Sequence, residues 1–213
     1  MTALHVGVDV DDVIFPWYER AHVACMIAGI TGGVDPTTWS PHEEYGCSEK
    51  DWHDVLEAAT LDGSLLSGDP YPGSVEALQR LEGAGHRIHL VTARGFLAQG
   101  HLIRKQTIDW LHEHKVPHDT LTFSKDKTLV RADVFIDDST RNVEALERAG
   151  VRTFMLSRPH NSRSTTYSPR VDSLSEFVDI ILSEEGTRAR GHITPYRRAR
   201  ATVLPVIPLH LGG

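Results

Sequence analysis

The chain has 213 residues, of which 40% are hydrophobic and 24% are charged, and its formal net charge is −7 at pH 7. This length and composition are typical of a globular protein with one good core and room for a small second lobe. Because no apolar run reaches the length of a membrane span and the N-terminus lacks a signal-peptide pattern, we expect a cytoplasmic protein without a membrane segment. The acidic charge argues against general nucleic-acid binding.

The first predicted elements are a buried strand and a helical insert. Residues 4–10 are a short apolar run that predicts a central strand covered on both faces. Residues 16–33 have a helical pattern that we expect to stop at Gly32 and Gly33, and residues 48–59 predict a helix with Ser48 as its N-cap. Residues 17–70 carry few strand signals, so we assign them to a small helical cap inserted after the first strand.

Strands and helices alternate from residue 72 onward. This alternation predicts an α/β fold with a Rossmann-like, three-layer parallel sheet, whose core comprises residues 1–16 and 71–183. The predicted helices span residues 73–85, 97–114, 139–150 and 173–186, the predicted strands span residues 86–93, 120–123, 133–137 and 151–156, and residues 157–170 form a polar loop.

Residues 184–213 form a distinct C-terminal extension. They hold five Arg against two Glu and include Pro195, Pro205 and Pro208, which prevent a long helix. Two interpretations stay open: a partly disordered extension, and a segment that packs on another subunit of a homodimer.

Polar side chains stand at the ends of three predicted strands. In a parallel sheet the site forms at the carboxyl ends of the strands, so we expect these side chains to meet. A cluster of carboxylates there must be neutralised, and Mg²⁺ is the simplest hard cation for that task. The residues are Asp9, Asp11, Thr92, Arg94, Asp137 and Asp138, with Lys127 just before the last of these strands.

Four short segments carry a family resemblance. DVDDV, LVTA, KDKT and FIDDS, which begin at residues 9, 90, 125 and 135, resemble the four motifs of the haloacid dehalogenase superfamily of phosphatases, in the same order. Residues 125–139 are similar to the corresponding stretch of 5′(3′)-deoxyribonucleotidases, which remove phosphate from nucleoside monophosphates, and the helical insert matches the cap of that group. The resemblance implies a haloacid dehalogenase-like core and a magnesium-dependent phosphomonoesterase.

The resemblance also implies roles for individual residues. Asp9 would be the nucleophile that forms an aspartyl-phosphate, and Asp11 would be the general acid and base. Thr92 would bind the phosphoryl oxygens, and Lys127 would offset their charge. The implied ligands of Mg²⁺ are Asp9, the backbone carbonyl of Asp11, and Asp138, with Asp137 close behind.

Substrate binding is expected from the cap and from the TAR segment. In the nucleotidase group an aromatic residue eight positions past the nucleophile lies against the base, and Trp17 has that offset. Trp39 and Trp52 are expected to pack between cap helices instead. We expect Ala93 and Arg94 to contact a small phosphate ester, and we interpret Arg94 as a phosphate or sugar contact whose loss raises KM more than it lowers kcat.

Other features favour different interpretations. Asp12 stands where the family usually has Gly, and we expect it to be solvated or adjacent to the metal ligands rather than a ligand itself. The 13 histidines lack an HExxH pattern, so we expect surface groups and no zinc site. Two alternative functions stay open: a phosphatase for 3′-phosphorylated nucleic-acid ends, which the acidic body disfavours, and a degenerate member that binds a nucleotide or a partner protein.

Overall fold

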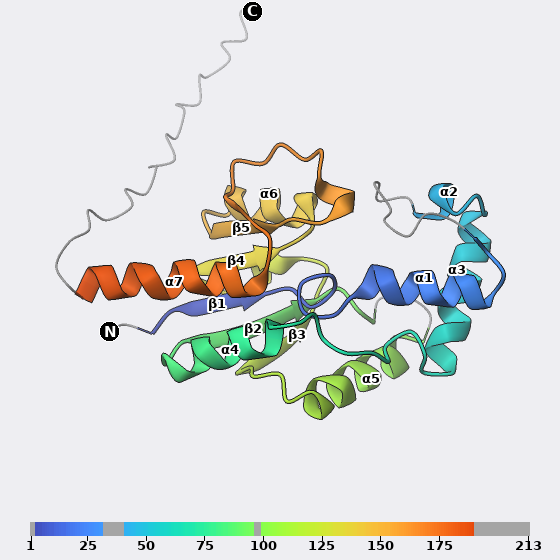
Figure 1. Cartoon of the computed structure of the whole chain (residues 1–213), viewed down its shortest axis with the longest axis horizontal. Coiled ribbons are helices and arrows are strands. Elements are labelled where there is room, and N and C mark those ends of the chain that lie inside the picture. The colour runs from blue at the N-terminus through green and yellow to red at the C-terminus, as the bar shows by residue number, and fades with distance from the viewer. Residues whose placement is uncertain (1–2, 32–40, 96–98, 190–213) are drawn as a thin grey trace, which may run out of the picture.

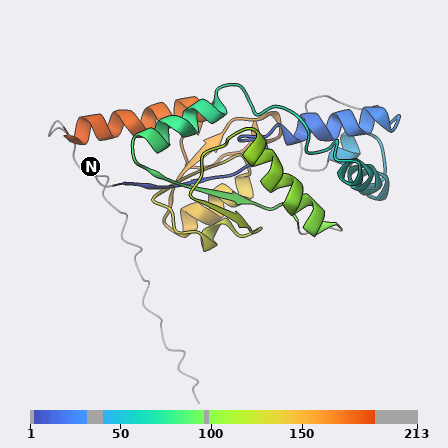
Figure 2. The same ribbon diagram turned by 90° about the horizontal axis from the view of Figure 1, so that it is seen from below.

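The structure is a computed structural model that describes residues 3–31, 41–95 and 99–189. These residues form a six-stranded parallel sheet with helices on both faces (Figures 1 and 2). The strands are β1 His5–Val8, β2 Arg87–Thr92, β3 Thr120–Phe123, β4 Val134–Asp137, β5 Arg152–Leu156 and β6 Arg170–Val171. The helices are α1 Trp17–Ile27, α2 Pro41–Glu44, α3 Glu49–Leu61, α4 Ser74–Gly83, α5 Gly100–Glu113, α6 Thr140–Arg148 and α7 Leu174–Ala189, with short 3₁₀ turns η1 Lys127–Leu129 and η2 Pro159–Asn161.

The sheet has the strand order β3-β2-β1-β4-β5-β6, and every neighbouring pair is parallel. Val8 at the end of β1 pairs with Leu90 of β2 and with Ile136 of β4. The chain therefore runs from β1 through β2 to β3 on one side and then crosses to β4 on the other side of β1, which is the switch in strand order where open α/β sheets form their sites. The predicted α/β fold with a Rossmann-like parallel sheet is confirmed.

Helices cover the two faces of the sheet. α4 and α7 lie side by side over one face, and α6 covers the other (Figures 1 and 2). Phe154 of β5 packs edge-on against Phe177 of α7, with ring centroids 5.1 Å apart, and both rings are fully buried. On the α6 side, a smaller cluster is built from Val91, Phe135 and Leu146. A sheet buried on both faces explains why the strands are continuous apolar runs.

Gly7 permits close packing in the middle of β1. A Cβ atom at this position would lie 2.1 Å from Cδ2 of Phe135 in the neighbouring strand β4. The Phe135 ring therefore occupies the space that any larger residue would need, which ties β1 closely to β4.

Helices α1, α2 and α3, which lie in the segment that we expect to form a cap, are found beyond the carboxyl ends of the strands (Figure 1). The Ser48 side chain accepts a hydrogen bond from Asp51 N at 3.1 Å, as expected for the N-cap of α3. The predicted end of the first helix is wrong, because α1 stops at Ile27 instead of Gly32. Gly29 takes a left-handed φ of 77°, and Ile30 N donates back to Cys25 O at 2.9 Å, which closes the helix there.

The segment after β5 is more ordered than a polar loop. It contains η2 and ends in β6, a sixth strand that the sequence does not predict. Nη2 of Arg170 donates to the carbonyl of Asn161 at 2.7 Å, and Ser157 N donates to Val171 O at 2.8 Å, so side-chain and backbone contacts together bring the edge strand back to the sheet. Trp39 and residues 190–213, which hold most of the predicted extension, lie outside the described residues. Among the helices that the structure describes, none has both the length and the apolar character to cross a bilayer.

Candidate active site

Asp9 and Lys127 form a buried ion pair at the carboxyl end of β1. The Lys127 ammonium donates to Asp9 Oδ1 at 2.6 Å and also to the backbone carbonyl of Val91. Asp9 follows β1 directly, and its backbone N donates to Ile136 O at 3.1 Å, so the strand pairing continues through it. Val10 N donates to Asp9 Oδ1 at 2.8 Å. Within the described residues, no hydrogen bond reaches the other oxygen, Oδ2.

Two further carboxylates lie beside this pair. Ligand atoms of Asp9, Asp137 and Asp138 lie within 4.8 Å of one another, and all three residues are buried. Asn142 Nδ2 donates to both oxygens of Asp137 at 3.1 and 3.0 Å, which fixes the orientation of that carboxylate. Three carboxylates face a single ammonium here, and an all-oxygen donor set of this kind fits a hard divalent cation.

The pKa values of the three carboxyl groups show that ionising them together is unfavourable in the absence of a metal ion. Burial raises the pKa of Asp9 despite the attraction of Lys127, and burial together with the charge of Asp9 raises the pKa of Asp137 and of Asp138 well above the usual range. Burial alone would lower the pKa of Lys127, but the attraction of Asp9 and Asp137 raises it. Lys127 therefore stays protonated and positively charged near pH 7. A divalent ion bound beside the three carboxyl groups would favour their ionised form.

Asp11 is held by Arg94. Nε and Nη2 of Arg94 donate to Asp11 Oδ1 at 2.9 and 2.7 Å, and Nη1 donates to Thr107 of α5 at 3.2 Å. The guanidinium also lies 4.5 Å over the ring of Phe15, and its side chain is only 4% exposed against 26% for Asp11. Each of the three guanidinium nitrogens of Arg94 therefore already has a hydrogen-bond partner within the protein. This arrangement does not favour the expected direct contact of Arg94 with phosphate or sugar.

The remaining predicted site residues lie around these groups. Thr92 is fully buried at the end of β2, with Oγ1 3.5 Å from Asp11 Oδ2. Ala93 is exposed between Thr92 and Arg94. Trp17 is half-buried at the start of α1, where its ring lies edge-on to Tyr18 at 5.4 Å and to Trp52 at 6.4 Å. Trp52 is buried in the cap and packs on Tyr45 as well, in agreement with a packing role.

Asp12 is not solvated, contrary to one expectation from the sequence. It is 4% exposed, and its backbone takes a left-handed φ of 54°, a conformation that glycine adopts without strain. Tyr18 N and the Tyr71 hydroxyl donate to Asp12 Oδ1 at 3.2 and 3.3 Å. Burial, and then the charge of Asp138, raise the pKa of Asp12 to about 8.

His160 corrects the prediction that the histidines are surface groups. It is 7% exposed, and its Nε2 lies 2.7 Å from Asp138 Oδ2. Burial lowers the pKa of His160 to about 4, so the imidazole is neutral near pH 7. His86 is also buried, at 4% exposed. The neighbouring Asn161 donates from Nδ2 to the carbonyl of Asp138 at 2.7 Å, which fixes η2 against the end of β4.

Six of the predicted site residues thus meet at one edge of the sheet: Asp9, Asp11, Thr92, Lys127, Asp137 and Asp138. A parallel sheet of this strand order, with an acidic cluster at the carboxyl ends of β1 and β4, has the architecture of haloacid dehalogenase-like hydrolases. Residues 3–188 match the family described as 5′ nucleotidase, deoxy (Pyrimidine), cytosolic type C protein, and the chain belongs to this family.

Individual relatives agree with that assignment. The chain is 30% identical to the "Putative 5′(3′)-deoxyribonucleotidase" of Chlorobaculum tepidum over 81% of this chain and 91% of the relative. It is 28% identical to the "Putative nucleotidase" of Bacillus cereus over 84% of this chain and 98% of the relative. A crystal structure of a haloacid dehalogenase-like hydrolase from Bacteroides fragilis shares the fold, with a TM-score of 0.56 and 13% identity over 83% of this chain and 100% of that one. The chain is therefore a hydrolase of the phosphatase and nucleotidase type.

Proposed function

We propose that the protein is a magnesium-dependent phosphomonoesterase that dephosphorylates deoxynucleoside 5′-monophosphates. The observation that supports this most is the buried contact between Lys127 and Asp9 beside Asp137 and Asp138. It joins a nucleophile, a fixed positive charge and a cation-binding set of oxygens at the carboxyl end of the central strand. The deoxyribonucleotidase name of a 30% identical relative supports the substrate class.

In this proposal each residue has one chemical task. Asp9 Oδ2 attacks phosphorus and forms an aspartyl-phosphate, while Asp11 gives a proton to the departing nucleoside oxygen and later takes one from the attacking water. Lys127 holds Asp9 and offsets the charge on the phosphoryl oxygens, which Thr92 binds. When bound by Asp9, Asp137, Asp138 and the carbonyl of Asp11, Mg²⁺ would supply further positive charge to the phosphoryl group.

The cap supplies the substrate contact in this proposal. Trp17 stands at the first turn of α1, where the chain leaves the loop that holds Asp9 and Asp11, and part of its ring is exposed. A nucleobase stacked on this ring would lie close to the phosphate site. In this proposal Ala93, which is exposed beside Thr92, contacts the same substrate.

The test is a screen of phosphate release. The purified chain would be offered deoxynucleoside and nucleoside monophosphates, common sugar phosphates and a 3′-phosphorylated oligonucleotide, in MgCl₂ and in EDTA. We expect the highest kcat/KM for deoxynucleoside 5′-monophosphates, and no turnover in EDTA. Asp9→Asn should abolish turnover, because an amide cannot form the aspartyl-phosphate.

Three outcomes would contradict the proposal. A preference for the oligonucleotide would assign the protein to nucleic-acid ends. Equal turnover in EDTA would remove the metal. Complete inactivity of a folded, magnesium-loaded protein toward every ester would favour a chain that binds nucleotides without hydrolysing them.

A further inference from the structure

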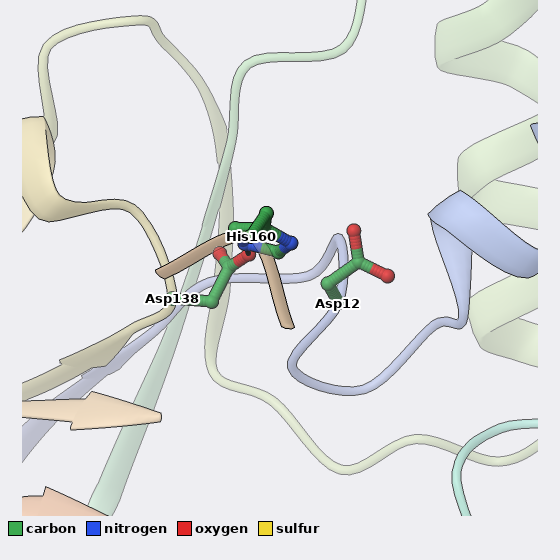
Figure 3. A group of neighbouring side chains, drawn as sticks. All are labelled: Asp12, Asp138 and His160. Carbon is green, nitrogen blue, oxygen red and sulfur yellow. Dashed lines mark hydrogen bonds and ion pairs between the residues drawn. The ribbon is translucent and has the colours of Figure 1, made fainter. Parts of the chain in front are cut away.

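Asp12, Asp138 and His160 form a second group of metal-ligating side chains next to the acidic cluster (Figure 3). One ligand atom from each residue lies within 4.8 Å of the other two. All three residues are more than nine-tenths buried. They come from the loop after β1, the end of β4 and the turn η2, so three segments that are distant in sequence converge on one point.

The two carboxyl groups of this site, those of Asp12 and Asp138, lack a lysine or arginine ion-pair partner within the described residues. Arg158 reaches the same loop, but its Nε donates to the backbone carbonyl of Asp12 at 2.7 Å, and its guanidinium lies 4.3 Å over the Tyr71 ring. Two buried carboxyl groups at this distance are costly to ionise, and a bound cation would offset that cost.

Hydrogen bonds hold the donor groups in place and leave one oxygen of Asp12 available. Both hydrogen bonds to its side chain, from Tyr18 N and from the Tyr71 hydroxyl, go to Oδ1, and within the described residues none reaches Oδ2. On the opposite side, Asn161 fixes the carbonyl of Asp138. Partners of this kind orient metal ligands before the ion arrives.

The donor set differs from that of the neighbouring cluster. Asp9, Asp137 and Asp138 offer only oxygen, whereas Asp12 and Asp138 are joined by the imidazole nitrogen of His160. A nitrogen donor favours first-row transition metals over Mg²⁺. Asp138 belongs to both groups, and a shared carboxylate is suited to hold two ions close together.

We infer that Asp12, His160 and Asp138 bind a second divalent cation of the transition-metal class, such as Mn²⁺, beside the oxygen-only cluster. This site goes beyond the proposed phosphatase activity and does not depend on it. The competing explanation is that His160 only donates a hydrogen bond to Asp138 across their 2.7 Å contact and positions a ligand of the first ion.

Metal stoichiometry separates the two explanations. The full chain would be stripped with a chelator and dialysed against Mn²⁺, and bound manganese per chain would be measured by elemental analysis. We expect two ions for the wild type and one for each of Asp12→Asn and His160→Phe. The asparagine keeps the shape and the Oδ1 acceptor, and the phenylalanine keeps a ring against Tyr18, whose centroid lies 4.8 Å from that of His160.

Two controls make the counts interpretable. His112→Phe, at an exposed position in α5, should keep both ions. Asp9→Asn should keep the ion at Asp12 and His160, and it should lower the affinity for the ion at Asp9, Asp137 and Asp138. Thermal unfolding of the metal-free variants shows whether each one folds.

The inference fails if the wild type binds no Mn²⁺, or if His160→Phe and Asp12→Asn fold and still bind as many ions as the wild type. A lower affinity at an unchanged count would assign His160 to positioning alone. Because the measurement counts ions and not turnover, an inactive protein that binds two ions would overturn the proposed function and leave this inference intact.

Discussion

Arg94 holds the carboxylate of Asp11 through two nitrogens, at 2.7 and 2.9 Å from Oδ1. The pair joins the loop after β1 to the end of β2, and Arg94 is itself fixed by Thr107 and by the face of Phe15. A planar guanidinium fixes a carboxylate more strictly than an ammonium does. Arg94 therefore sets where the proposed acid and base of the reaction points.

This contact changes the kinetic signature that we expect for Arg94→Ala. If Arg94 acts through Asp11, kcat for nucleotides should fall by about 10- to 100-fold, which is less than the roughly 10²–10⁴-fold that general acid–base catalysis contributes, because Asp11 itself remains; KM should change less. Arg94→Lys should recover only part of the loss, because lysine cannot make the two-nitrogen contact.

The leaving group provides the decisive measurement for Arg94. p-Nitrophenolate departs without a proton, so the burst of p-nitrophenol from the first step should survive in Arg94→Ala while nucleotide turnover falls. An unchanged kcat with a strongly raised KM would instead restore Arg94 as a direct contact to phosphate or sugar.

Trp17→Ala should weaken nucleotide binding without changing the chemistry. If the base stacks on this half-buried ring, KM for deoxynucleoside monophosphates should rise roughly 5- to 150-fold, the range that corresponds to about 1–3 kcal/mol of stacking. Deoxyribose 5-phosphate lacks a base, so its KM should stay the same.

Trp52→Phe is the matched control for Trp17. Trp52 is 5% exposed and packs on Tyr45, so its replacement should lower the Tm of the protein and leave the ratio of the two KM values unchanged. Equal effects of Trp17→Ala on both substrates would remove Trp17 from base binding.

Gly7→Ala should destabilise the sheet itself. The added Cβ would lie 2.1 Å from Cδ2 of Phe135, and overpacking of this kind costs about 1–3 kcal/mol of unfolding free energy. Gly83→Ala is the control, because a Cβ at this exposed helical position meets nothing within 4 Å, and alanine stabilises helices by about 0.5–1 kcal/mol relative to glycine. Denaturant unfolding should therefore shift in opposite directions in the two variants.

The positions of Asp9, Asp137 and Asp138 could be predicted because they depend on strand ends. A buried parallel strand is a short apolar run, and the polar residue that follows it lies at the carboxyl edge whatever the details of packing. The Lys127 contact with Asp9 crosses 118 residues, and it became predictable from the order of the four motifs rather than from local pattern.

The directions of long side chains and the path of loops could not be predicted in the same way. The sequence places Arg94 beside Thr92, but whether its guanidinium faces substrate or Asp11 depends on Phe15 and Thr107, which are distant in the chain. His160 lies in a polar segment without periodicity, and contacts of Asn161 with Asp138 and Leu156 bring it into the site. Such contacts leave no local signal in composition.

The stability of the metal-free protein should depend on pH through Asp12. The pKa of this carboxyl is raised from 3.8 to about 8 in the folded protein, so between these values the folded state binds more protons than the unfolded state. The free energy of unfolding therefore falls as the pH rises through this window. Asp12→Asn removes the group, and the Tm of the variant minus that of the wild type, measured in EDTA, should grow from pH 4 to pH 8.

The comparison with the variant isolates Asp12 from its neighbour. The pKa of His160 is lowered to about 4 from 6.5, so this histidine adds stability as the pH rises through that range, and it does so in both proteins. Its contribution largely cancels in the difference. Added Mn²⁺ should reverse the order of the two proteins at pH 8, because the ion binds the folded wild type through the carboxylate that the variant lacks. Tm curves that stay parallel across pH, with and without metal, would show that Asp12 carries no buried charge.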